Sequence, residues 1–153
     1  MIALAGEKLD PPALLADFIA QSGGAGGVVS FTGIVRGVHR GEAIEELWLD
    51  HHERLTLTSI RAIGAAARDR FALTGIAIVH RVGAVLPGEP ILFAAAAAEH
   101  RRAAFEALDY MIDRLKTDAM LWKREQRPDG THWIEARPAD HDDRSRWEAD
   151  GDD

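Results

Sequence analysis

Two lysines stand close together in a chain that otherwise takes its positive charge from arginine. Of its 18 lysines and arginines, only Lys8, Lys116 and Lys123 are lysines, and the last two lie within eight residues of each other. A lysine amine loses its proton when it is desolvated or crowded by other cations, whereas an arginine effectively never does. The pair could therefore act as a general acid or base, although arginine-rich codon usage would leave the same pattern.

The segment MLWKRE indicates which side chains would accompany the second lysine. The alternation of a β-strand would place Lys123 and Glu125 on one face and Trp122 and Arg124 on the other. Lys116 would close the preceding helix. Structural roles stay open for both lysines, because a lysine complements the C-terminus of a helix and discourages aggregation on an edge strand.

Basic side chains at two other points predict an anion site. His100 and Arg101 stand where a predicted helix begins, and the free N–H groups of a helix N-terminus suit a phosphate or carboxylate. Arg36 ends the apolar segment VVSFTGIVR just before a glycine-bearing loop, in which His39 and Arg40 add positive charge. Solvated surface arginines and a capping histidine are the alternative interpretation.

Missing residue types exclude several kinds of site. The chain has no cysteine, which excludes disulfides, thiolate zinc sites and a cysteine nucleophile, so any sulfur chemistry would need sulfur carried by another molecule. Adjacent His51 and His52 would point to opposite faces of a strand and no HExxH spacing occurs, so no metal is expected. The sequence also contains no P-loop and no GxSxG motif.

The net charge of −7 is concentrated at the C-terminus. Residues 138–153 contain seven acids and two arginines, whereas residues 1–137 hold 18 acids and 16 bases. A nucleic-acid-binding protein would show a basic excess, so no nucleic acid is expected as a partner. The longest apolar run, 91–98, is too short to span a membrane, and the N-terminus lacks a signal-peptide pattern, so a cytoplasmic location is expected.

Hydrophobic periodicity predicts an α+β domain over residues 1–137 and an acidic, mobile tail over residues 138–153. The predicted elements are a helix that begins at 10 and ends before 23, strands at 28–36 and 44–52, a helix at 53–71, strands at 75–82 and 90–98, a helix at 100–116, and a hairpin of strands at 120–126 and 131–137. This order is no regular alternation of strand and helix, and it predicts a mixed, mostly antiparallel sheet with three main helices.

Five motifs in fixed order carry a family resemblance: FTGIVRG, HRVGAVLPGE, AEHRRAAFEA, LKTDAMLWKRE and THWIEAR. From about residue 27 to 137 the chain resembles the catalytic (large) subunit of molybdopterin synthase. The resemblance implies an α/β-hammerhead-like fold and conversion of cyclic pyranopterin monophosphate to molybdopterin. Two sulfurs would come from the C-terminal thiocarboxylate of a small ubiquitin-like subunit. A homodimer with one small subunit docked at each end, a heterotetramer, is implied, with no cofactor of its own.

The resemblance also implies roles for individual residues. Lys116 would lie where the Gly-Gly tail of the carrier ends, and Lys123 would be the acid or base beside the pterin. His100, Arg101 and Arg36 would bind the phosphate and the pterin. We therefore expect all five side chains to face one cavity, in the monomer or in the dimer.

Three further residues are placed at the substrate site by the same resemblance. Arg124 and Glu125 would flank the pocket, and Arg137 would reach across the dimer into the neighbouring site. The chain departs from the family pattern after Arg36, where Gly37–Val38 replaces an Asn-His-like pair and a histidine follows one place later.

Two alternative functions compete with a sulfurtransferase. A non-catalytic adaptor could bind the tail of a ubiquitin-like protein, but it would need positive charge and not lysine in particular. A lysine that forms a Schiff base with a phosphorylated carbonyl compound is the third hypothesis. Replacing Lys123 by arginine distinguishes the sulfurtransferase from the adaptor, because an adaptor should tolerate the substitution.

Overall fold

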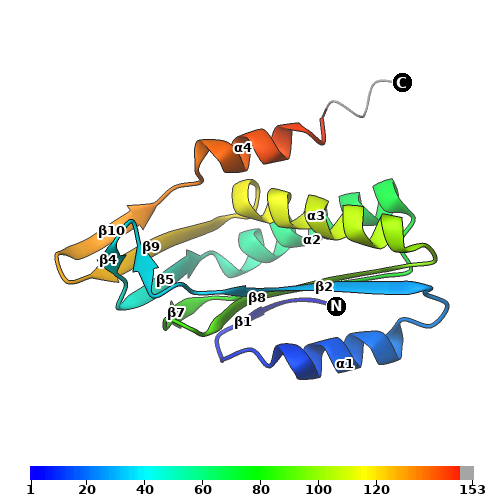
Figure 1. Ribbon diagram of the computed structural model, residues 1–153, viewed down its shortest axis with the longest axis horizontal. Coiled ribbons are helices and arrows are strands. Elements are labelled where there is room, and N and C mark those ends of the chain that lie inside the picture. The colour runs from blue at the N-terminus through cyan, green and yellow to red at the C-terminus, as the bar shows by residue number, and fades with distance from the viewer. Residues whose placement is uncertain (149–153) are drawn as a thin grey trace.

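Two four-stranded β-sheets form the framework of the computed structural model, which describes residues 1–148 (Figure 1). The strands are β1 (Ile2–Ala5), β2 (Gly27–Ile34), β3 (Val38–His39), β4 (Glu42–Ala43), β5 (Glu46–His51), β6 (Gly75–Arg81), β7 (Gly83–Val85), β8 (Pro90–Ala98), β9 (Leu121–Arg127) and β10 (Gly130–Ile134). The helices are α1 (Pro11–Gln21), α2 (Glu53–Phe71), α3 (Arg101–Thr117) and α4 (Pro138–Ser145).

The strand order is β1-β6-β8-β2 in the first sheet and β10-β9-β5-β7 in the second, while β3 and β4 pair in a separate hairpin. Among the described strands only β1 and β6 run parallel to each other. The predicted α+β class and the mostly antiparallel pairing are confirmed. The strands are divided between two main sheets, whereas the sequence predicted one.

Helices cover both faces of the first sheet, with α2 and α3 on one side and α1 on the other (Figure 1). The central strand β8 is buried on both faces. Its Ala94 and Ala96 pack towards α2 and α3, and its Ala95 and Ala97 pack towards α1. Alanine is a weak strand former, so burial between two helical layers, and not intrinsic preference, holds this segment extended.

Local signals set the beginnings of two helices. Asp10 accepts a hydrogen bond from the backbone N–H of Ala13 at 3.0 Å, and Pro11 occupies the first turn of α1. His52 accepts one from the N–H of Leu55 at 3.4 Å and so caps α2, which spans the predicted residues. His52 therefore has a structural task at this helix end.

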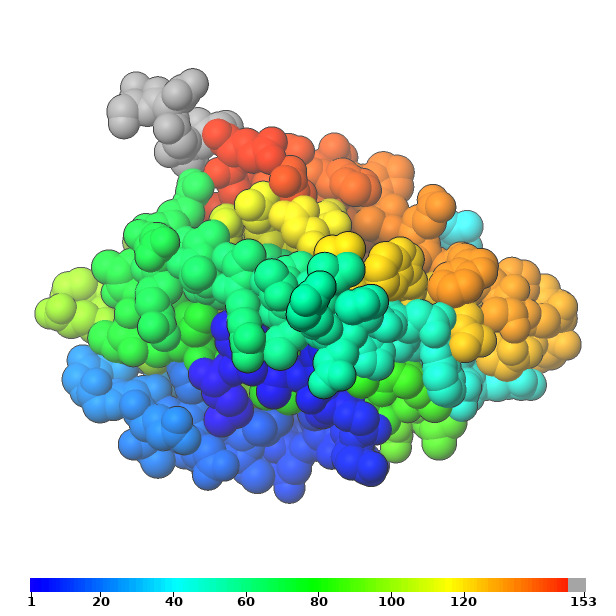
Figure 2. All heavy atoms as spheres, turned by 180° about the vertical axis from the view of Figure 1, so that it is seen from behind, coloured from blue at the N-terminus to red at the C-terminus, as the bar shows by residue number. Residues whose placement is uncertain are grey.

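The structure contains five elements that the sequence reading missed: β1, β7, the paired strands β3 and β4, and α4. Strand β1 pairs with β6, which lies more than 70 residues further along the chain, and a local pattern cannot reveal such a partner. Helix α4 stands where a mobile tail was predicted, and it lies over α3 (Figure 2). The Trp147 ring just beyond it contacts the rings of Phe71 and Tyr110, with centroids 6.0 and 5.5 Å apart. The remainder of the predicted tail, 149–153, lies outside the described residues.

None of the helices within residues 1–148 has the length and apolar character needed to cross a membrane.

Candidate functional site

A cavity of about 780 Å³ opens where the second sheet meets the C-terminal end of α3. The loop after β2, the β9–β10 hairpin and the beginning of α4 complete its walls. Both Lys116 and Lys123 line it. The other side chains in its walls that can carry charge are Arg36, His39, Arg40, Glu125, Arg127, His132, Glu135, Arg137 and Asp140.

Lys123 lies in the wall of this cavity because strand β9, which contains it, is an inner strand of the second sheet. Lys123 pairs with Leu49 of β5 on one side and with Ile134 of β10 on the other. Leu121, Lys123 and Glu125 all line the cavity, as the alternation of a strand predicted. Their neighbours on the strand lie on the opposite face of the sheet.

Arg124 therefore does not line the cavity. Its Nε donates to Asp50 at 3.0 Å, and its guanidinium carbon lies 5.0 Å from the centroid of the Trp48 ring. Both partners belong to β5, and the pairing keeps the arginine on the outer face of the second sheet. The structure thus separates Arg124 from Glu125, although sequence reasoning had grouped them at the same site.

The environment of Lys123 destabilises its charged form. Burial lowers the pKa of its amine, the positive charge of Lys116 lowers it further, and the carboxylate of Asp140 acts in the opposite direction. An amine whose pKa is depressed gives up its proton more readily than an ordinary lysine does, which suits an acid or base. This is the property that the sequence analysis sought in the lysine pair.

Lys116 forms an ion pair inside the cavity. Its Nζ lies 3.2 Å from Oδ1 of Asp140, a buried carboxylate that also accepts from Arg137, at 2.9 Å from the side-chain Nη2 and 2.9 Å from the backbone N–H. These donors hold the pKa of Asp140 well below its usual range. Sequence reasoning missed Asp140 because it counted as one acid among seven in the tail.

Arg137 lines the cavity of its own chain, where it holds this carboxylate. A role of Arg137 in the site of a partner chain stays a prediction.

Arg36 and Arg40 supply positive charge at the opening of the cavity. Both side chains are exposed, and neither has a hydrogen-bond or ion-pair partner among residues 1–148. An unpartnered guanidinium beside a concave surface is available to an anionic ligand, and its planar fork suits a phosphate or a carboxylate.

A second ionic network closes the far wall of the cavity. Glu125 is buried. Its carboxylate accepts hydrogen bonds from Nδ1 of His39 at 2.9 and 3.0 Å and from the guanidinium of Arg127 at 2.6 and 2.9 Å. Arg127 also reaches Glu42 of β4 at 2.6 Å. Sequence reasoning treated His39 only as a local positive charge, and nothing in a linear pattern links it to a residue 86 positions away.

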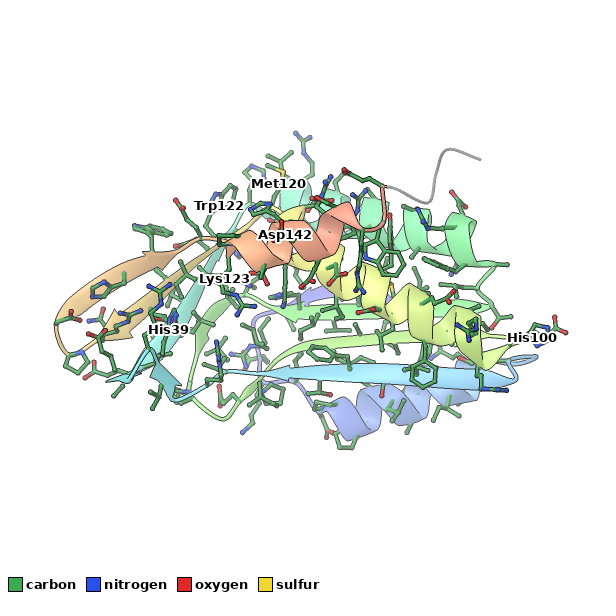
Figure 3. The ribbon with its side chains drawn as sticks, turned by 45° about the horizontal axis from the view of Figure 1, so that its top comes forward. His39, His100, Met120, Trp122, Lys123 and Asp142 are labelled. Atoms are coloured by element: carbon green, nitrogen blue, oxygen red, sulfur yellow. The ribbon has the colours of Figure 1, made fainter. Side chains whose placement is uncertain are left out.

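His100 and Arg101 lie at the other end of α3 from the lysines. A helix of 17 residues is about 25 Å long, so its two ends cannot share a pocket within one chain. Figure 3 shows His100 at the opposite end of the molecule from Lys123 and His39. At that end, His100 and Arg101 line a separate cavity of about 690 Å³ together with Gly26 and Phe105. The imidazole of His100 makes no capping hydrogen bond and is exposed.

His80 is a further titratable group near the lysine cavity that sequence reasoning missed. Its Nδ1 donates to the backbone carbonyl of Arg81 at 2.8 Å, and its ring is buried. Burial lowers the pKa of His80 to about 4, and the charge of Lys123 adds to the effect. The ring therefore stays neutral at pH 7.

The arrangement can bind an anion and move a proton beside it. Within residues 1–148, no group of three or more histidines, aspartates and glutamates is placed to hold a metal ion. The ingredients are one buried amine, a second amine already engaged by a carboxylate, and exposed guanidiniums at the rim.

Comparisons with known proteins point to one family. A family model described as the MoaE protein matches residues 4–118. The molybdopterin synthase catalytic subunit of Caulobacter vibrioides is 41% identical over 148 residues, which cover 97% of both chains. A solved structure described as the molybdopterin biosynthesis MoaE protein from Burkholderia ambifaria is 35% identical, with a TM-score of 0.81 and 97% of both chains covered.

A more distant structure shares the fold. It is described as a protein–protein complex of subunits 1 and 2 of the molybdopterin-converting factor from Helicobacter pylori. The matched chain is 24% identical, the TM-score is 0.73, and the alignment covers 89% of this chain and 91% of that one.

Proposed function

This chain belongs to the MoaE protein family, and from that premise we propose that it catalyses the synthesis of molybdopterin from cyclic pyranopterin monophosphate. It inserts two sulfurs that a thiocarboxylated, ubiquitin-like small subunit delivers. The observation that carries the proposal is the buried amine of Lys123 beside Lys116 in a cavity rimmed by unpartnered arginines. A chain without cysteine must receive its sulfur from elsewhere, which agrees with an external carrier.

The carrier's tail is proposed to end at Lys116. The contact between Lys116 and Asp140 at 3.2 Å supports this role, because the ammonium donates to a carboxylate at that point of the cavity. A terminal carboxylate or thiocarboxylate presents the same charge and similar geometry. Lys123 is proposed as the acid or base of the reaction, and Arg36 as a ligand of the substrate phosphate.

His100 and Arg101 are proposed to serve the cavity of a second copy of the chain. They are too distant from the lysines of their own chain, and they line a separate cavity at the beginning of α3 together with Arg102, Glu99 and Glu106. A symmetric dimer that places these residues against the lysine cavity of the partner would assemble the five side chains that were expected to face one cavity. With one small subunit at each end, the assembly is a heterotetramer.

Residues 1–137 are proposed as the catalytic domain, to which α4 contributes the carboxylate of Asp140. The cytoplasmic location expected from the sequence is likewise a proposal, and cell fractionation followed by detection of the chain tests it.

The test of the proposed function replaces Lys123 by alanine and, separately, by arginine, and measures molybdopterin formed from the pterin and a thiocarboxylated carrier. Loss of an acid or base is expected to slow turnover by about 10²–10⁴-fold. Arginine keeps the charge but cannot give up its proton, so it should be as inactive as alanine.

Lys8→Ala is the matched control, because Lys8 lies outside the cavity and its side chain is exposed. Full turnover by Lys123→Arg would contradict an acid–base role. Binding of the carrier without turnover by the unaltered chain would indicate a non-catalytic adaptor instead.

A further inference from the structure

The side chain of His39 is oriented as a general base would be. Neither the family assignment nor the roles proposed for the lysines explain this orientation. Its ring lines the same cavity as the two lysines. Both oxygens of the Glu125 carboxylate lie within 3.0 Å of Nδ1. A carboxylate only accepts, so the proton of the neutral ring is on Nδ1, and Nε2 keeps its lone pair.

Glu125 is itself fixed in place. It is 5% exposed, and the guanidinium of Arg127 grips the same carboxylate at 2.6 and 2.9 Å. Arg127 Nη2 lies 3.3 Å from His39 Nδ1, which is longer than either contact of that nitrogen with the carboxylate. The carboxylate therefore decides the tautomer of His39, and the arginine neutralises the buried negative charge.

Nε2 of His39 takes no part in these contacts. Among residues 1–148, the partners of the His39 ring are all found at Nδ1. The residue comes from the short β3–β4 hairpin, whereas Glu125 and Arg127 come from β9, next to Lys123. Folding thus places an imidazole that is oriented by a carboxylate, with one nitrogen available, in the wall of a cavity that already holds a buried amine.

We infer that His39 is the general base that activates water in the hydrolytic half of the reaction, with Glu125 as its positioning residue. The inference rests on the proposed function. After attack of the carrier's sulfur on the substrate, the two molecules are joined through a thioester, which water must cleave before the carrier can leave.

In this hydrolysis, water is divided between His39 and the carrier. Nε2 of His39 takes one proton from water while the water oxygen bonds to the thioester carbonyl carbon. The carbon–sulfur bond breaks, and its electron pair stays with the sulfur, which remains on the pterin and receives a proton from the ammonium form of Lys123. The carboxylic acid formed on the carrier ionises to solvent, and the carrier leaves as a carboxylate. The imidazolium of His39 then loses its proton to solvent and the amine of Lys123 takes one up, so both groups are restored.

The decisive experiment is a single turnover of His39→Gln with thiocarboxylated carrier and pterin substrate, followed by intact-protein mass spectrometry. Glutamine can still donate a hydrogen bond to Glu125 but cannot take up a proton. The expected result is a covalent carrier–substrate adduct that forms at the normal rate and is hydrolysed about 100-fold more slowly. His39→Ala should regain hydrolysis when free imidazole is added.

His51→Gln is the matched control, since His51 is exposed at the end of β5 and lies outside the cavity. Thermal unfolding of each variant separates a folding defect from a chemical one. Hydrolysis by His39→Gln at the control's rate would overturn the inference, as would a failure of adduct formation in a folded variant. If the unaltered chain forms no molybdopterin with its carrier, the proposed function fails and not merely the role of His39.

Discussion

A lysine ammonium in a buried position loses hydration, and a second ammonium nearby adds repulsion. Lys123 meets both conditions, because burial and the charge of Lys116 lower its pKa while Asp140 partly compensates. The depression is therefore a property of a group of residues and not of one side chain. A substitution at a neighbouring residue can therefore change the pKa of Lys123 while Lys123 itself is kept.

At the residue scale, Lys116→Ala should raise the pKa of Lys123. The substitution removes a like charge and frees the Asp140 carboxylate, and both changes favour the protonated amine. Reductive ¹³C-methylation followed by NMR titration measures this, and three lysines give a simple spectrum. Lys8→Ala should leave the titration of Lys123 unchanged. A fall in the pKa of Lys123 after Lys116→Ala would refute the proposed coupling.

At the scale of elements, α4 joins the cavity to the helical layer. Its residue Asp140 is held by Lys116 of α3, while Arg146 at its end donates to Asp109 and Asp113 of α3, each at less than 3 Å. The Trp147 ring packs against aromatic residues of the same layer. The helix is thus fixed both at the cavity and against the body of the protein.

Asp140→Asn should lower the free energy of unfolding by about 1–3 kcal/mol at pH 7, because a buried charged acceptor with two cationic donors is lost. The folded-state pKa of Asp140 lies below its unfolded value of about 3.9, so its contribution is complete above that pH and is lost as the pH falls further. Urea denaturation at pH 7 and pH 3 should show the difference between variant and unaltered chain shrinking in acid. An equal difference at both pH values would count against this account.

At the scale of the whole molecule, the two cavities lie at opposite ends of α3. One holds the lysines and the other holds His100 and Arg101. A single chain therefore contains the predicted residues without bringing all of them together. Assembly of two copies is the simplest way in which both cavities could serve one substrate.

Mixing Lys123→Ala with Arg101→Ala subunits tests this assembly. If each site combines both chains, mixed dimers contain one intact site, and random pairing should restore about a quarter of the unaltered activity from two inactive variants. The measurement is molybdopterin formation after subunit exchange, with each variant alone as the control. If the mixture stays as inactive as its components, His100 and Arg101 do not act across the dimer.

The sequence by itself determined most of the local elements and identified the two clustered lysines as candidates for acid–base chemistry. Hydrophobic periodicity located α2 at its observed residues, and strand alternation placed Lys123 and Glu125 on one face. These features depend on near neighbours in the chain, so a linear pattern contains them.

Only the tertiary structure decided which distant side chains meet. It brought Asp140 to Lys116, brought Glu125 to His39, and kept His100 apart from both lysines. Such contacts depend on how α4, the β3–β4 hairpin and the two sheets pack, and packing joins residues dozens of positions apart. The depressed pKa of Lys123 belongs to the same class, because burial and the approach of other charges arise only when the chain has folded.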